Sequence, residues 1–158
     1  MREPKEQVDL TEIFDAIEFP DAYKISYLAN AIIIPTYEDV LQTFGLLRVE
    51  YHLLMCLAHY PTLAAQDVAR MTRMPRNSVS RAVMRMDQEG FLTRTPDVVD
   101  KRKSKLKITP EGRAIHDQIA RWFAQREREV LGSLSTSERK RFQDLLSKLV
   151  MSAASLDR

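Results

Sequence analysis

The stretch PRNSVSRAVMRMDQEGFLTRTPDVVDKRKSKLKITPEG, residues 75–112, decides the fold. Its first half predicts an amphipathic helix over Pro75–Glu89, because apolar residues recur there at three- and four-residue spacing. The positions expected to be buried are Val79, Ala82, Val83 and Met86. Gly90 follows, and glycine adopts the left-handed conformation at a helix end without strain. The rest of the helix surface is polar and basic, so we expect it to stay exposed.

A second, shorter helix is expected over Ala64–Met71, one tight turn before the first. Val68 and Met71 would point toward the core. Two short helices joined by a tight turn, the second with a basic outer face, are the form of a helix-turn-helix. A third helix is expected over Arg48–Tyr60, where the apolar positions suit burial, and Pro61 stops it.

After the helix-turn-helix, the apolar period changes to two, in Phe91–Thr95 and again in Ser104–Thr109. This pattern predicts a β-hairpin with a cationic tip. Pro110 then begins a long amphipathic helix, and a capping box at Ser135 and Glu138 begins a last one. Both helices are too long for the small core alone, which indicates a partner subunit.

The N-terminal region predicts a bent or broken helix. Pro20 and Pro35 interrupt its helical pattern, because a proline inside a helix removes a hydrogen bond and clashes with the preceding turn. Gly45 is expected to end this section. The fold class is thus mainly helical (α+β): a winged helix-turn-helix with a two-stranded β-wing and long N- and C-terminal dimerisation helices.

The composition is that of an ordinary folded protein. The chain has 158 residues, of which 44% are hydrophobic and 29% charged, and this size predicts a single domain. The one cysteine, Cys56, allows no disulfide within the chain, and no apolar run approaches the roughly 18 residues of a membrane span. The charged start MREPKEQVD is unlike a secretory signal. We therefore expect a cytoplasmic protein that does not bind membranes.

The net charge of +2 hides an uneven distribution. Residues 70–107 carry eleven Lys and Arg against four Asp and Glu, whereas residues 1–50 carry four against ten. The basic quarter coincides with the predicted helix-turn-helix and hairpin. A basic patch on such a surface favours a nucleic-acid partner, and an ordinary solvated face is the alternative.

These elements, in this order, resemble the MarR (multiple antibiotic resistance regulator) family of winged-helix transcription factors. The motifs that carry the resemblance are Asn77-Ser78-Val79-Ser80-Arg81, Glu89-Gly90-Phe91, Arg94, and the wing Asp100-Lys101-Arg102 followed at a fixed interval by Ile108-Thr109 and Gly112. The resemblance implies one MarR-type domain over residues 1–158. Within it, residues 46–109 would bind DNA, and residues 9–45 and 110–156 would form a helical dimerisation region.

The first half of the Pro75–Glu89 helix would read DNA bases, because recognition helices place their N-terminal residues in the major groove. Arg76 and Arg81 would bind guanine and Asn77 adenine, each through paired hydrogen bonds. Gln66 and Arg73, on the preceding helix and turn, would lie on phosphates. The remaining predicted contacts to the DNA backbone are Ser78, Ser80 and Arg85.

The wing would enter the adjacent minor groove. Arg102 resembles the family arginine inserted there, where a narrow A·T-rich groove concentrates negative potential. Asp100, two residues earlier, resembles the acid that orients this arginine. Lys101, Lys103 and Lys105 would add salt-sensitive attraction to phosphates.

The resemblance further implies a homodimeric repressor on double-stranded DNA, with the half-sites of an inverted repeat about 10–10.5 base pairs apart. Release by a small aromatic carboxylate or phenol is also implied, without a metal or other cofactor. Candidate residues around such a ligand are Tyr23, Tyr27, Asn30, His52, Met55, Cys56 and His59. Two alternatives stay open: a core or interface role for these residues, and a regulator without a ligand.

No motif predicts an enzyme. The sequence has no G-x-S-x-G, P-loop, H-E-x-x-H or glycine-rich dinucleotide turn. The remaining alternative is a winged-helix homodimer that acts as a protein-interaction adaptor. Five basic residues among Lys101–Lys107, with no aromatic residue beside them, favour DNA over a protein partner.

Overall fold

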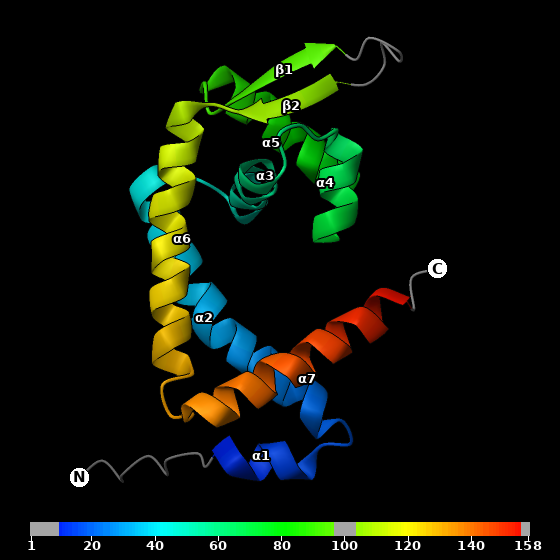
Figure 1. Cartoon of the computed structure of the whole chain (residues 1–158), viewed down its shortest axis with the longest axis vertical. Coiled ribbons are helices and arrows are strands. Elements are labelled where there is room, and N and C mark those ends of the chain that lie inside the picture. The colour runs from blue at the N-terminus through cyan, green and yellow to red at the C-terminus, as the bar shows by residue number, and fades with distance from the viewer. Residues whose placement is uncertain (1–9, 97–103, 156–158) are drawn as a thin grey trace, which may run out of the picture. The chain divides into compact units, whose positions relative to one another are not determined.

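The computed structural model describes residues 10–96 and 104–155. These residues form seven helices and one two-stranded antiparallel sheet (Figure 1). In chain order the elements are α1 (Leu10–Ala16), α2 (Pro20–Phe44), α3 (Arg48–His59), α4 (Ala65–Thr72), α5 (Arg76–Gln88), β1 (Leu92–Pro96), β2 (Ser104–Ile108), α6 (Pro110–Val130) and α7 (Thr136–Ser155). The predicted mainly helical class with a β-wing is therefore confirmed.

The chain divides into two compact units. Unit 1 contains the described residues up to Ile33 and from Arg126 onward, and unit 2 contains Ile34–Gln125. Unit 2 thus includes the helix-turn-helix and the hairpin. Its core is formed by α3, α4, α5 and the hairpin, with the C-terminal part of α2 and most of α6 packed against them.

The helix α5 has its predicted buried stripe. Val79, Ala82, Val83 and Met86 are all buried in the core of unit 2. In α4, Val68 is buried as predicted, but the inward orientation predicted for Met71 is wrong, because its side chain is 44% exposed. The inward stripe of this two-turn helix runs instead through Ala65, Val68, Ala69 and Thr72, which leaves Met71 at its edge.

The turn into α6 explains the spacing of the Thr-x-x-Gly motif. Thr109 Oγ1 donates a hydrogen bond to the carbonyl of Gly90 at 2.8 Å and accepts one from the N–H of Gly112 at 3.1 Å. A Cβ on Gly112 would collide with the carbonyl oxygen of Phe91. Thr109 therefore caps α6, and Gly112 allows this helix to lie directly against the base of the hairpin.

The hairpin has the predicted alternation. Leu92 of β1 pairs with Ile108 of β2, and this register places Leu106 in the core, 1% exposed, while Lys105 and Lys107 face outward. The backbone N–H of Leu106 donates to the carbonyl of Leu63, and the N–H of Leu63 donates to the carbonyl of Leu106. Leu63 lies just before the start of α4. The base of the wing is therefore fixed to the helix-turn-helix through backbone as well as side chains.

The helix α2 corrects one expectation. The chain is broken before Pro20, which becomes the first residue of α2, so that interruption is confirmed. The interruption predicted near Pro35 is wrong, because α2 continues through it as a 25-residue helix. Thr36 and Val40, both fully buried, lie one and five positions after Pro35, so packing of these turns outweighs the lost hydrogen bond.

In unit 1, α7 lies against α2 and the end of α6 around an apolar groove of about 450 Å³. Ser135 and Glu138 form the predicted capping box, since the Ser135 N–H donates to Glu138 Oε2 at 2.8 Å and the Glu138 N–H donates to Ser135 Oγ at 3.4 Å. No described residue of α7 is buried. Within the described ranges, no helix is both long and apolar enough to cross a membrane.

Candidate nucleic-acid interface

The helix-turn-helix is closed by an unusual turn between α4 and α5. Arg73 ends α4 with a φ of 56°, which is the left-handed region that side chains rarely adopt. Pro75 then occupies the N-cap of α5 without a side-chain cap hydrogen bond. Its fixed φ instead begins the helix, and the Ser78 and Val79 N–H groups donate to the Pro75 carbonyl at 3.0 and 3.1 Å.

One face of α5 is exposed from its first turn onward. Arg76, Asn77, Ser80 and Arg81 are all exposed, and they share this face because they are one, four and five positions apart. The opposite face is the buried stripe of the core. The structure therefore brings these four predicted residues together on one surface. Ser78 is half-buried at the edge of that face.

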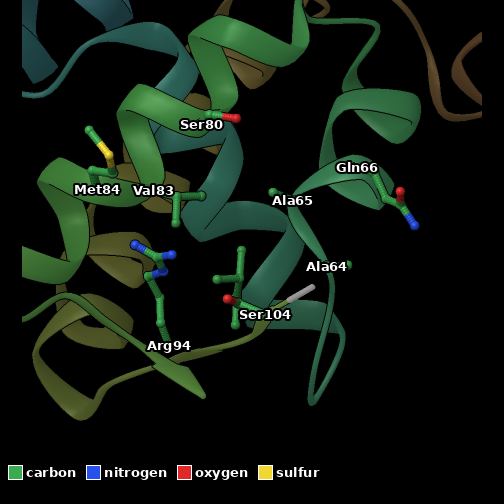
Figure 2. A pocket seen from close by; sticks show the side chains of 9 residues that line it. Ala64, Ala65, Gln66, Ser80, Val83, Met84, Arg94 and Ser104 are labelled. Atoms are coloured by element: carbon green, nitrogen blue, oxygen red, sulfur yellow. The ribbon is translucent and has the colours of Figure 1, made fainter. Parts of the chain in front are cut away.

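A groove of about 280 Å³ runs beside this face (Figure 2). It lies between the start of α4, the middle of α5 and the hairpin. Its lining residues are Ala64, Ala65, Gln66, Ser80, Val83, Met84, Arg94, Ser104 and Leu106. In Figure 2, Arg94 extends from β1 toward Val83 and Met84, while the amide of Gln66 points away from the groove. Gln66 is thus placed at the outer rim of the groove.

Met84 and Arg94 are among the groove residues that the predicted set of DNA contacts lacks. Met84 is 53% exposed on α5, one turn beyond Ser80, and Arg94 adds a positive charge at the base of the hairpin. The signal for Met84 was available, because it has the same helical phase as Arg76, Asn77 and Ser80. Met84 could have been singled out because it is an apolar residue on an otherwise polar face of the helix.

The tip of the wing lies outside the described residues. Asp100, Lys101, Arg102 and Lys103, predicted to enter the minor groove and to hold phosphates, all belong to it. Lys105 is described: it is exposed on β2, opposite Thr95 of β1. The described part of the hairpin thus has exposed basic residues on both strands, Arg94 on β1 and Lys105 and Lys107 on β2.

Arg85 differs from the other predicted DNA contacts, because its guanidinium is engaged within the protein. Its Nη1 donates to both carboxylate oxygens of Glu50, at 3.0 and 2.9 Å, and its Nε donates to Glu89 at 3.0 Å. Its Nη2 donates to the carbonyl of Gly45 at 3.0 Å. These acceptors raise the pKa of Arg85 above its ordinary value, Glu89 through its hydrogen bond contributing most.

The residues predicted around a small ligand fall in different units. In unit 1, the rings of Tyr23 and Tyr27 each lie 5.5 Å from Phe14, and Asn30 is exposed. The two tyrosines thus pack on α1. This packing agrees with the alternative of a structural role, in which neighbouring aromatic side chains stabilise one another.

The other four predicted ligand residues lie on α3 in unit 2. His52 Nδ1 lies 2.8 Å from the Arg48 carbonyl oxygen, and His59 Nδ1 lies 2.9 Å from the Met55 carbonyl oxygen. Because a carbonyl oxygen can only accept, Nδ1 of each histidine carries a proton and donates it. Burial lowers the pKa of His52 and raises that of the Cys56 thiol, which is 3% exposed. A neutral buried thiol is a poor nucleophile.

Around these histidines lies an aromatic cluster that the sequence did not predict. Tyr51 stacks between Phe123 and His116, at centroid distances of 5.3 and 6.0 Å, and Tyr37 packs edge-on against Tyr51 and Phe123. His59 lies edge-on to His116 at 5.9 Å. Within the described ranges, no group of three or more His, Cys, Asp and Glu side chains is placed to hold a metal ion.

Comparison with known proteins identifies this arrangement. Residues 44–103, which include the helix-turn-helix and the first strand of the wing, match the MarR family. Over these residues the chain is similar to proteins of the MarR family. Members of the MarR family are DNA-binding transcriptional regulators and not enzymes.

The individual proteins that the chain resembles are distant from it in sequence. The homoprotocatechuate degradative operon repressor of Escherichia coli is 19% identical over 114 residues, which cover 72% of this chain and 77% of that repressor. The crystal structure of MarR matches with a TM-score of 0.79 at 18% identity, over 96% of this chain and 98% of MarR. BpsR of Bordetella bronchiseptica, whose DNA binding is regulated by 6-hydroxynicotinic acid, matches with a TM-score of 0.63 at 22% identity, over 80% and 98%.

Proposed function

We propose that this MarR-family regulator is a homodimeric repressor that binds an inverted repeat in double-stranded DNA through α5 and the wing. The observation that carries the proposal is the exposed face of α5. Arg76, Asn77, Ser80 and Arg81 lie together on it, and the opposite face anchors the helix in the core. Arginine and asparagine make paired hydrogen bonds to guanine and adenine in the major groove, so this face carries base-reading chemistry.

The homodimer is supported by the apolar surface of unit 1. Leu149, Val150 and Met151 on α7 are 56%, 63% and 71% exposed, and Phe19 before α2 is 63% exposed. Apolar side chains gathered on one element in this way mark an interaction surface. A second copy of the chain would cover them and would provide the second reading head that an inverted repeat requires.

The proposed signal is a small aromatic carboxylate or phenol whose binding releases the DNA. BpsR, a structural relative, is regulated by 6-hydroxynicotinic acid, which is a ligand of this class. The candidate set keeps Tyr23, Tyr27, Asn30, His52, Met55, Cys56 and His59. Such a ligand acts only if it binds one conformation more tightly than the other. A protein-interaction adaptor is the second candidate function, and the exposed apolar groove residue Met84 is the observation that favours it.

The test begins with duplexes selected by the wild-type protein from a random-sequence library. The proposal expects the selected duplexes to share an inverted repeat with half-site centres about 10–10.5 base pairs apart. Arg81→Ala and Arg102→Ala should each weaken binding by roughly 1–3 kcal/mol, and a panel of aromatic acids should contain a compound that releases the duplex. Arg121→Ala, which removes an exposed charge on α6, is the matched control. Unchanged binding by both reading-head variants would contradict the proposal.

A further inference from the structure

Unit 2 contains an ion pair, Arg85–Glu50, in which the carboxylate is buried. Glu50, in the first turn of α3, is only 2% exposed. Arg85 Nη1 donates to its two oxygens at 3.0 and 2.9 Å, and the Leu47 N–H donates to Oε2 at 2.7 Å. A charged carboxylate away from water is strongly disfavoured unless donors surround it, so Arg85 is needed wherever Glu50 is buried.

The same guanidinium fixes two further points. Nη2 donates to the carbonyl of Gly45 at 3.0 Å, and Nε donates to Glu89 at 3.0 Å, so all three nitrogens are engaged. Gly45 follows the end of α2 with a φ of 63°, and Glu89 is the C-cap of α5. One side chain therefore joins the end of α2, the start of α3 and the last turn of α5.

We propose that Arg85 is a positioning residue for DNA recognition, which acts by anchoring α5 and does not itself contact phosphate. The proposal rests on the proposed function, because it takes α5 to be the helix that reads DNA. With 13 residues, α5 is a rod of about 20 Å. An anchor at its C-terminal turn sets the angle of the whole rod, and a small rotation there moves Arg76 and Asn77, at the opposite end, the farthest.

Binding titrations over a range of salt concentrations distinguish an anchor from a phosphate contact. The probe is one duplex selected by the wild-type protein from a random-sequence library. The variants are Glu50→Gln, Arg85→Lys and Arg85→Gln, and Arg121→Gln is the control for loss of one positive charge. The slope of log K against log salt reports the number of phosphate contacts, and each contact contributes about one.

An anchor predicts that Glu50→Gln weakens binding by about tenfold or more, although it removes a negative charge from a DNA-binding protein. Arg85→Lys should weaken binding similarly, because an ammonium group cannot hold Glu50, Glu89 and Gly45 in one plane. The salt slope of every variant should equal that of the wild type. The double variant Glu50→Gln/Arg85→Gln should bind no more weakly than Arg85→Gln alone, because both changes remove the same anchor.

A phosphate contact predicts the reverse, and this result would overturn the proposal. Arg85→Gln would lower the salt slope by about one, Arg85→Lys would bind nearly as well as the wild type, and Glu50→Gln would bind unchanged or more tightly. Circular dichroism checks the fold of each variant, and if Arg85→Gln does not fold, Arg85→Lys and Glu50→Gln decide. Failure of the wild-type protein to select any sequence would contradict the proposed function itself, before any variant is compared, and would remove this role with it.

Discussion

Gly112 lies where any side chain would meet the backbone of the hairpin. A Cβ there would collide with the carbonyl oxygen of Phe91 and would lie 3.1 Å from Cγ1 of Ile108. We predict that Gly112→Ala lowers the free energy of unfolding by about 1–3 kcal/mol, because α6 must move away from the hairpin. Denaturant unfolding measures this loss. Gly132→Ala, in the turn before α7, is the comparison, since its nearest neighbours lie at 3.1 Å or beyond; equal losses would contradict the account.

The phenols of Tyr51, which is buried, and Tyr37, which is half-buried, predict a loss of stability at high pH. Burial raises the pKa of both Tyr37 and Tyr51 to about 12, from an ordinary value of 10, although Arg48 opposes the shift at Tyr37. In the unfolded chain both phenols ionise near pH 10, whereas in the folded protein they keep their protons until about pH 12. The stability that they contribute is therefore complete below pH 10 and is lost as the pH rises toward 12.

The measurement for this prediction is a pH titration of phenolate absorbance with parallel unfolding experiments. Part of the absorbance change of the wild-type protein should appear only as the pH approaches 12, and Tyr37→Phe or Tyr51→Phe should each remove a share of that part. The unfolding midpoint of each variant should also fall less steeply above pH 10 than that of the wild type. A titration in which all tyrosines ionise together near pH 10 would exclude the buried aromatic cluster.

At the scale of the element, α2 carries a proline that its helix tolerates. Pro35 lies in the interior of this 25-residue helix, where it cannot donate to the carbonyl of the preceding turn. We predict that Pro35→Ala raises the free energy of unfolding by roughly 1–3 kcal/mol, because alanine restores that hydrogen bond and the best helix propensity. Thermal and denaturant unfolding measure the gain, and Glu38→Ala, at an exposed position of α2, should change stability little. A destabilised Pro35→Ala would mean that the proline ring is required for packing.

The elements themselves could be predicted where their signals are local. The stripe of α5, the left-handed Gly90 and the capping box at Ser135 each depend on residues within one or two turns, and all three are confirmed. Pro35 and Met71 could not be placed correctly, because burial of neighbouring positions against distant segments decided their conformations. The local sequence pattern therefore predicted where the helices lie, whereas tertiary packing determined the two positions, Pro35 and Met71, at which the prediction was wrong.

In the candidate site too, the features that depend on local sequence could be predicted, and those that depend on distant residues could not. The exposed face of α5 follows from helical phase alone, so Arg76, Asn77 and Arg81 could be grouped from the sequence. The engagement of Arg85 could not, because its partner Glu50 is 35 positions away. Glu50 did have a local signal, because it lies three residues after Leu47, which is the spacing of a capping box. Its carboxylate accepts a hydrogen bond from the Leu47 N–H.

At the scale of the whole molecule, α7 predicts the assembly. Leu145, Leu149, Val150 and Met151 of this helix are exposed and none of its described residues is buried, so we expect a second copy to cover these apolar side chains. We predict that Leu149→Glu yields a folded monomer, because the carboxylate would have to be buried in the subunit interface. Sedimentation equilibrium measures the mass, and Lys148→Glu, at the neighbouring exposed position, should leave the dimer intact. A wild-type monomer would contradict the predicted dimer, and an intact Leu149→Glu dimer would place the interface elsewhere.

We propose above all that α5 and the wing of a dimer of this chain recognise one DNA sequence. The most direct test of this proposal is the affinity for the selected duplex, compared with a shuffled duplex of equal length and composition at several salt concentrations. We expect the selected duplex to bind at least about 10³ times more tightly and both affinities to fall as salt rises. Equal and weak binding to the two duplexes would contradict it, because the basic surface would then attract phosphates without reading bases.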